Sequence, residues 1–351
     1  MRKLKIGYWP LSSNLKSPGD RRRVVFWAEA RGHSIVTDLT QNVDAIVVSE
    51  NSDFNSVVLA QREIPVILDL VDAYLSPLNP IDDLARGLVK KVSGQISGGL
   101  KPFSHHIRDV CLSSRAVICS SLEQEAVIKP YNKNTHIILD SHDEIPFIKP
   151  SVKKKDSNNE IQVLWEGQPA TIRGVKSISP VLSELSKTNN LRLNFVTDQK
   201  YFRILNKYFE GNTLNLLKKD LNDISALVHL IPWATDNLIS AAQESSIAMI
   251  PIDLTVPMQR LKPENRLLIM WRLGLPCLTS SSPAYVRVER LAGVNAVSTN
   301  LETWLFNFNR LLEDPSFAKE EVLRGQNYLH EFHTREILLK KWDLAFDSVM
   351  G

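Results

Sequence analysis

Residues 247–286 read IAMIPIDLTVPMQRLKPENRLLIMWRLGLPCLTSSSPAYV, and they carry the clearest fold signal in the chain. Ile247 to Ile250 is a short apolar run of the kind that forms a strand buried on both faces. After a polar loop, Glu264 to Leu273 has the apolar spacing of a helix, and Pro276 to Leu278 begins a second apolar run. A buried strand, a helix and another buried strand in succession predict a β–α–β unit in a parallel sheet.

The same alternation extends over the rest of the chain. Further strands of the second half are predicted at Ile161–Trp165, Leu191–Val196 and Leu227–Ile231, with helices near Arg173–Leu185 and Asn237–Gln243. Strands of the first half are predicted at Lys5–Trp9, Ala45–Val48, Val66–Leu70, Ala116–Cys119 and His136–Leu139. The segment from Thr303 to Met350 is helical in pattern. The fold class is therefore α/β, with two parallel sheets covered by helices.

The chain is expected to divide near its middle. Its 351 residues exceed the size at which one core usually stops growing, about 250–300 residues. Residues 149–160 read KPSVKKKDSNNE, which is polar, lacks apolar periodicity and is typical of a linker. We predict a first domain of residues 1–150, a linker of residues 151–160, a second domain of residues 161–325, and C-terminal helices in residues 326–351. The last helix, near Arg335 to Val349, is expected to return to the first domain.

Bulk composition excludes several classes of protein. The apolar fraction is 43%, yet no run reaches the roughly 18 apolar residues of a membrane-spanning helix. The N-terminal segment lacks the pattern of a secretory signal, so we expect a cytoplasmic protein. Three cysteines, Cys111, Cys119 and Cys277, have neither disulfide nor zinc spacing and are expected to be buried.

Basic residues cluster although the net charge is only +3. The clusters are Arg21–Arg23, Lys90–Lys91 and Lys153–Lys155. They are either solvated surface or a site for an anionic partner, meaning substrate phosphates or, through peripheral contact, an anionic membrane. Nucleic acid is not expected as a partner, because no binding motif accompanies the charge.

The start of the predicted helix at Pro263 is a candidate anion site. Ligands of parallel sheets lie outside the carboxyl ends of the strands, and this segment supplies two such ends and a helix N-terminus. Free amides there, with Lys262, would suit a diphosphate. The alternative is an ordinary helix start with a solvated lysine.

This segment resembles the donor-binding region of the group 1 (family 4-like) glycosyltransferases. The resemblance rests on strand, lysine-bearing loop, helix, Gly274-Leu275-Pro276 and serine-rich turn, preceded by Val163 to Gln168 and by Arg173-Gly174-Val175. It implies the GT-B fold, in which two Rossmann-like domains with parallel sheets face each other across a cleft. The first domain would then receive the acceptor and the second would bind a nucleotide sugar as substrate, with no cofactor and no metal.

The resemblance assigns candidate residues one at a time. An arginine and a lysine that bind the diphosphate in the family correspond to Gln168 and Arg173, so one cation of the two is kept. Two family glutamates, eight residues apart, correspond to Leu261 and Ile269, which cannot accept hydrogen bonds from hydroxyls. Asn265 is expected to compensate by reaching the nucleotide, or else to serve only its helix start. The complete set of predicted donor-binding residues is Gly19, Gly167, Gln168, Arg173, Lys262, Glu264, Asn265 and Arg266.

The predicted catalytic residues are Asp72, His106 and Asp253. Asp253 follows a predicted strand in the second half and would contact sugar hydroxyls. Asp69 and Asp72 lie at the end of a predicted buried strand, where they are either cleft residues or helix caps. His106 is either a base in the cleft or a structural residue. With Gly19 and Arg21, Asp72 and His106 would receive the acceptor.

The first predicted helix follows a polar loop that ends at Gly19. Asp20 is expected to cap this helix, Val24, Trp27 and Ala28 to form its buried face, and Gly32 to end it.

The function expected from this resemblance is transfer of a hexose from a nucleotide sugar to a saccharide or lipid-linked acceptor, with retained configuration, in polysaccharide biosynthesis. Two alternatives stay open. One is a sugar-nucleotide epimerase or hydrolase of the same fold, which acts on the donor alone. The other is a non-catalytic subunit that binds the nucleotide sugar, because the two glutamates are missing.

Overall fold

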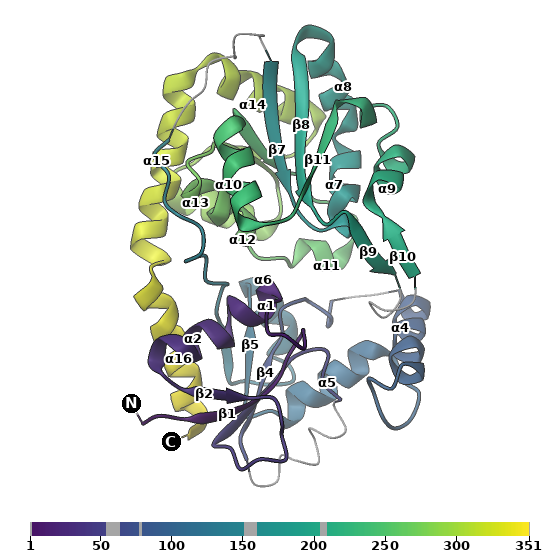
Figure 1. The fold of residues 1–351 in the computed structure, drawn as a ribbon, viewed down its shortest axis with the longest axis vertical. Coiled ribbons are helices and arrows are strands. Elements are labelled where there is room, and N and C mark those ends of the chain that lie inside the picture. Colours follow the sequence, from purple (N-terminus) through teal and green to yellow (C-terminus); the bar gives the residue numbers. More distant parts are fainter. Residues whose placement is uncertain (1, 54–63, 77–78, 151–159, 204–208, 351) are drawn as a thin grey trace. The chain divides into compact units, whose positions relative to one another are not determined.

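The computed structural model describes residues 2–53, 64–76, 79–150, 160–203 and 209–350, so the predicted linker of residues 151–160 lies outside the described residues except for its last residue, Glu160. The chain forms two compact units. The first unit comprises Met1–His142, Leu261–Pro263 and Thr334–Gly351, and the second comprises Asp143–Arg260 and Glu264–His333. Each is described by itself (Figure 1).

The first unit is built on a six-stranded sheet in the order β2-β1-β3-β4-β5-β6, with every neighbouring pair parallel. Its strands are β1 (Lys5–Trp9), β2 (Ser34–Val36), β3 (Ala45–Val48), β4 (Val66–Asp69), β5 (Ala116–Cys119) and β6 (Thr135–Ile137). Its helices are α1 (Pro18–Arg21), α2 (Val24–Arg31), α4 (Pro80–Val92), α5 (Phe103–Ser113), α6 (Leu122–Ile128) and α16 (Arg335–Met350). All five predicted strands are present, and the short edge strand β2 is additional.

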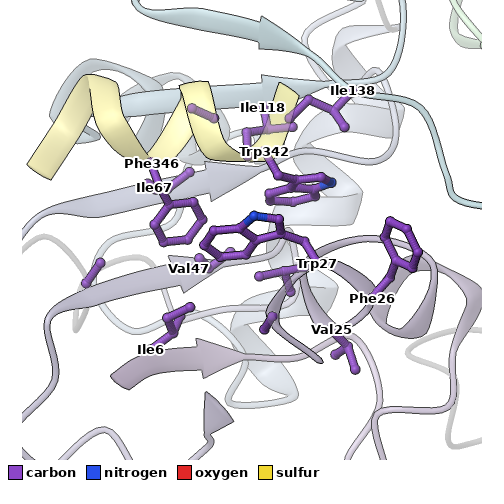
Figure 2. Packing of buried hydrophobic residues seen from close by; sticks show 14 of the residues in the cluster. Ile6, Val25, Phe26, Trp27, Val47, Ile67, Ile118, Ile138, Trp342 and Phe346 are labelled. Carbon is purple, nitrogen blue, oxygen red and sulfur yellow. The ribbon is translucent and has the colours of Figure 1, made fainter. Parts of the chain in front are cut away.

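The C-terminal helix α16 completes the core of this unit (Figure 2). Phe346 and Trp342 stack on the Trp27 indole of α2, with ring centroids 4.1 and 6.0 Å away. The Trp27 Nε1–H donates to the Asp343 carboxylate at 2.7 Å, which satisfies the polar atom of a buried ring. Helix α2 ends at Gly32, which has a left-handed φ of 68°. The predicted helix and its buried face are confirmed.

The second unit is built on another six-stranded parallel sheet, in the order β11-β8-β7-β12-β13-β14. Its strands are β7 (Glu160–Glu166), β8 (Asn190–Thr197), β11 (Val228–Pro232), β12 (Ile247–Ile250), β13 (Cys277–Ser280) and β14 (Val297–Ser298), and a separate antiparallel pair joins β9 (Lys200–Arg203) to β10 (Phe209–Asn212). Its helices are η1 (Pro169–Thr171), α7 (Ile172–Ser177), α8 (Ser179–Thr188), α9 (Thr213–Asp220), η2 (Ser225–Leu227), α10 (Thr235–Glu244), α11 (Pro257–Arg260), α12 (Asn265–Arg272), α13 (Pro283–Ala292), α14 (Leu301–Glu313) and α15 (Pro315–Phe332). Two parallel sheets with interleaved helices confirm the predicted fold class.

Residues 143–150 pack in the second unit, although the sequence division placed them in the first. The Ile148 carbonyl accepts a hydrogen bond from Gln326 Nε2 at 2.8 Å, and Arg272 Nε donates to the Ile145 carbonyl at 2.8 Å. The Phe147 ring stacks on His330 with centroids 4.4 Å apart. These contacts to α12 and α15 come from distant segments, so local composition did not indicate them.

Local predictions fail at two places for identifiable reasons. The single helix expected at Arg173–Leu185 is split into α7 and α8, because Pro180 at the start of α8 has no N–H to continue the preceding helix. Asp20 does not cap α2, whose N-cap is Arg23. Instead the Asp20 carboxylate accepts hydrogen bonds from the Tyr8 hydroxyl at 2.6 Å and the Leu11 amide at 2.8 Å, which ties the loop after β1 to the sheet.

Burial is as expected for the cysteines. All three are free and buried, and burial raises the pKa of the Cys111 and Cys119 thiols to about 12. Within the described residues, no helix is both long and apolar enough to cross a membrane.

Candidate functional site

The order in which successive strands are added to the second sheet reverses at β7. Strand β7 pairs with β8 on one side and with β12 on the other, so the loops that leave β7 and β12 separate at the carboxyl edge. Such a switch point is where open parallel sheets bind ligands. It is formed here by Gly167 and Gln168 after β7 and by Pro251 to Asp253 after β12. Of these residues, the sequence analysis selected Gly167, Gln168 and Asp253.

Gly174 brings the start of α7 against the loop after β12. A Cβ atom at Gly174 would lie 2.1 Å from the Pro251 carbonyl oxygen, so only glycine permits this approach. The approach places Arg173 Nη2 3.4 Å from Asp253 Oδ2. The Arg173 side chain is 66% exposed and that of Asp253 is 18% exposed. The guanidinium therefore has donors available to a ligand at the switch point.

Gly167 makes room for Arg266 on the other side of the switch point. A Cβ atom at Gly167 would lie 3.1 Å from Arg266 Nη1, and that nitrogen donates to the Glu166 carbonyl at 3.1 Å. Arg266 also hydrogen-bonds the buried Tyr285 of α13. Arg266 of α12 thus links the end of β7 to α13.

The start of α12 contains the next candidates. Glu264 is 6% exposed and occupies the N-cap position, and Asn265 is the first residue of the helix. The Asn265 Oδ1 atom is shielded from solvent and accepts no hydrogen bond from the described residues. One turn later Ile269 is 2% exposed, within the core. Of the two positions that correspond to family glutamates, Ile269 is a core residue, while Leu261 belongs to the first unit.

A pocket of about 220 Å³ adjoins this edge, beyond the ends of β12, β13 and β14. Its hydroxyl and amide side chains come from the end of α7 and from the ends of β13 and β14 with the residues that follow them, and Trp304 forms an apolar wall. The lining residues are Ser177, Ile178, Ile252, Leu254, Ser280, Ser281, Ser298, Thr299, Asn300, Leu301 and Trp304. The serine-rich turn after β13 was identified from the sequence, but Ser177 and the 298–300 segment were missed, because nothing local marks them as neighbours.

Buried polar contacts hold the pocket in place. The Ile252 amide donates to Ser280 Oγ at 2.9 Å, which fixes the loop after β12 to the end of β13. The Glu289 carboxylate accepts from Thr279 Oγ1 at 2.5 Å and from the Ala296 amide at 2.9 Å, so it ties α13 to β13 and to the approach to β14. Burial raises the pKa of Glu289 to about 7.

The remaining predicted site residues lie in the first unit. Lys262 Nζ pairs with Asp72 Oδ1 at 2.9 Å, and both side chains are about one-third exposed. His106 is 2% exposed within α5, and burial lowers its pKa to about 4, so its imidazole is neutral. Gly19 is buried against the loop after β1, where a Cβ atom would lie 2.3 Å from Leu11 Cδ1. Their roles as catalytic or binding residues stay predictions.

In the arginine cluster at 21–23, Arg22 and Arg23 are buried, so the interpretation of the cluster as solvated surface is wrong for these two residues. Arg23 is fully buried, and its Nε donates to Asp69 Oδ2 at 2.9 Å while its Nη1 lies 3.1 Å from Asp140 Oδ1. Burial alone would lower the Arg23 pKa, but the two carboxylates raise it above its usual value. Asp69, considered as a cleft residue or helix cap, is an internal ion-pair partner instead.

Glu50 was missed by the sequence analysis. It follows β3, and β1 pairs with β2 on one side and β3 on the other, so Glu50 lies at the switch point of the first sheet. It is 7% exposed, and its Oε2 accepts no hydrogen bond from the part of the chain that the structure describes. Burial, with a smaller effect of Asp72, raises its pKa to about 8. A single glutamate after a strand has no distinguishing sequence signal.

The chain was compared with protein families, curated sequences and solved structures, and the solved structures that resemble it share one fold. No protein-family profile and no curated protein sequence matches the chain. Among solved structures it is similar to WaaG, a glycosyltransferase involved in lipopolysaccharide biosynthesis, with 14% identity, a TM-score of 0.56 and 99% of each chain covered. It is also similar to HepE from Anabaena, solved with UDP and glucose, with 11% identity, a TM-score of 0.62, and 98% of this chain and 100% of that one covered.

A third similar structure is TarM, with 10% identity and a TM-score of 0.58 over 86% of this chain. The chain spans 54% of the length of TarM. At these identities the likeness concerns the fold. The chain thus has the GT-B fold, with two Rossmann-like units of parallel sheet and interleaved helices.

Proposed function

We propose that this chain is a glycosyltransferase that takes a sugar from a nucleotide-sugar donor and transfers it to a hydroxyl of a saccharide or lipid-linked acceptor. The observation that carries the proposal is the exposed Arg173 guanidinium at the switch point of the second sheet, next to a hydroxyl-lined pocket. A nucleotide sugar presents a diphosphate and several hydroxyls, which suit a cation and neutral polar groups respectively. HepE, of the same fold, was solved with UDP and glucose, so UDP-sugars are the first donors to test.

The chemistry required of the protein is mainly electrostatic. As the bond between the anomeric carbon and the diphosphate breaks, negative charge grows on the leaving phosphate. Arg173 and the free amides at the start of α12 would stabilise that charge, because the N-terminal end of a helix carries positive potential. Hydroxyls of Ser281 and Thr299 would hold the donor, with Asp253 near the sugar. Retention of configuration is part of the proposal.

Asn265 is proposed to take over the nucleotide contact for which Ile269 is unsuited. Its shielded Oδ1 is an acceptor for a ribose hydroxyl, and a buried acceptor without a partner is costly unless a ligand supplies one. Lys262, paired with Asp72, is proposed as a second cation.

A thermal-shift screen tests donor binding. The full chain is heated with UDP, GDP, ADP and their common sugar derivatives, and a ligand at 100 times its Kd should add about 2.7 kcal/mol of stability. Donor consumption is then followed with and without acceptors. If no nucleotide shifts the melting temperature, the donor site is overturned.

A non-catalytic nucleotide-sugar-binding subunit is the second candidate, favoured by the buried Ile269 at a family glutamate position. It predicts stabilisation by a nucleotide sugar without turnover across an acceptor panel. Release of free sugar or an altered sugar nucleotide with donor alone would instead indicate the hydrolase or epimerase.

A further inference from the structure

Helix α4 exposes a continuous apolar face. Ile81, Leu84, Leu88 and Val92 are 76%, 43%, 46% and 80% exposed, and we call these four residues the α4 stripe. Their spacing of three, four and four residues places them on one side of the helix, over a length of about 16 Å. The neighbouring helix α5 exposes one large apolar side chain among its described residues, Leu112, which is 59% exposed.

The opposite side of α4 faces the protein, and it is polar or small. Asp83 is 7% exposed and accepts a hydrogen bond from the Ser104 amide of α5 at 3.0 Å. A Cβ atom at Gly87 would lie 2.1 Å from the Lys101 carbonyl oxygen, so backbone packs directly on backbone there. The Lys90 ammonium lies 5.0 Å from the centre of the Phe103 ring. Figure 1 shows α4 beside α5 in this unit.

This orientation is the reverse of the usual one. A surface helix of a water-soluble domain normally buries its apolar stripe and exposes its charges. Turning α4 about its axis by half a turn would bury the stripe, yet Asp83, Gly87 and Lys90 make specific contacts on the inner side. The apolar face is therefore held outward by the packing of the unit.

The chain around the α4 stripe is basic. Residues 80–115 contain six Lys or Arg and three Asp or Glu, a net charge of +3, which equals the net charge of all 351 residues. Lys91 is exposed next to the stripe. The side chains of Lys101 and Arg108 are 35% and 38% exposed, and they share the single carboxylate of Asp109, so together these three groups keep a net positive charge. Asp82 is exposed at the N-terminal end of α4, so the cations gather toward its C-terminal end and in the segment that follows.

We propose that the α4 stripe docks on an anionic lipid bilayer, with its apolar side chains among the upper acyl chains and Lys91, Lys101 and Arg108 against lipid phosphates. An amphipathic helix with an apolar face and basic flanks binds at the interface of such a membrane, and each nearby cation strengthens the attraction. A second copy of the chain fits less well, because four side chains of one helix fall far short of the 20 or so residues per side in a standard interface. The contact would bring the first unit to lipid-linked molecules, but it does not depend on the proposed function.

Vesicle sedimentation tests the docking. The full chain is spun with vesicles of equal parts phosphatidylglycerol and phosphatidylcholine, and separately with vesicles of phosphatidylcholine alone. The stripe variant is Leu84→Ser with Leu88→Ser, and the matched control is Leu344→Ser on α16, a 63% exposed leucine outside the stripe. The charge variant is Lys91→Glu. Melting curves check that each variant is folded, as expected for substitutions at exposed positions.

We expect the wild type to sediment with anionic vesicles at least tenfold more strongly than with neutral ones, and less strongly as salt is raised. The stripe variant should lose at least tenfold in partitioning, the charge variant severalfold, and the control nothing. Wild-type protein that stays in the supernatant, or a stripe variant that binds like wild type, overturns the proposal. A wild-type dimer in analytical ultracentrifugation that the stripe variant abolishes also overturns it and makes the stripe an interface between copies.

Discussion

The carboxyl edges of the two sheets differ in what their polar side chains contact. At the first edge most charges pair with one another, since the Arg23 guanidinium is buried between Asp69 and Asp140 and Lys262 pairs with Asp72. Glu50 is the exception, because its Oε2 accepts no hydrogen bond from the described residues. At the second edge neutral hydroxyls line a pocket and Arg173 is 66% exposed. Both edges follow from the same parallel topology. A polar residue at the end of a strand is thus a ligand candidate only if the fold has not already used it.

The largest effect is expected from Arg23→Met, which leaves Asp69 and Asp140 buried without their cation. Breaking a buried ion pair by removing one partner costs about 3–5 kcal/mol. Urea unfolding at neutral pH should show that loss, with Arg2→Met as control because the Arg2 side chain is 72% exposed. A loss of the same small size in both variants would mean that the buried network does not stabilise the first unit.

Next in size is the pH dependence caused by Glu50. Its pKa is raised from an ordinary 4.5 to about 8, so the folded protein holds this proton more tightly than the unfolded chain. The contribution of this proton to the free energy of unfolding is fully present below pH 4.5. It decreases as the pH rises to 8, by about 1.4 kcal/mol per pH unit at most.

Glu50→Gln removes this titration. The free energy of unfolding of the variant, relative to that of the wild type, should therefore rise between pH 5 and pH 8 by a few kcal/mol at most. Thermal melting across that range measures the difference, and Glu29→Gln on the exposed side of α2 serves as control. The groups that influence Glu50 are Asp72, Asp69 and Lys90. A difference that does not vary with pH would show that Glu50 is ionised in the folded protein.

At the second edge, Arg173→Ala should weaken binding of the best nucleotide from the screen by about tenfold or more, since a hydrogen bond to a charged group contributes about 1.5–3 kcal/mol. The melting temperature without ligand should hardly change, because the Arg173 side chain is 66% exposed and lies 3.4 Å from Asp253, and ion pairs at the surface contribute about 0–1 kcal/mol. Calorimetry gives the affinity. The same titration with Lys262→Ala tests the second proposed cation, and unchanged affinity in the double variant would remove both residues from the site.

The smallest effect is expected from Asn265→Ala, which should weaken nucleotide binding a few-fold to tens of fold, about 1–2 kcal/mol for a hydrogen bond to a partly buried group. Calorimetry is paired with a melting curve of the free protein. A variant that binds normally but melts earlier would make Asn265 a helix-start residue and leave the ribose without an assigned partner.

Local sequence patterns predict the helices and strands and their order along the chain. Uniformly apolar runs of four to eight residues between helical segments mark strands that are buried on both faces, and this local pattern is sufficient to predict two parallel sheets. Gly32 at the end of α2 could be predicted because a left-handed residue at a helix end favours glycine. Arg173, Asp253 and the serine-rich turn were identified at the second edge because they follow predicted strands or open a predicted helix.

Which of these residues contact one another depends on long-range packing that local patterns do not encode. Strand β7 lies next to β12, about 80 residues later, so Gly174 meets Pro251 and Arg173 meets Asp253. Arg23 and its neighbour Arg21 look alike in the sequence, and only packing buries Arg23 against carboxylates from β4 and the segment after β6. Helix α4 has an amphipathic pattern that predicts a buried apolar face, yet contacts to α5 turn that face outward. Periodicity specifies that a helix has two faces, whereas long-range contacts select which face is buried.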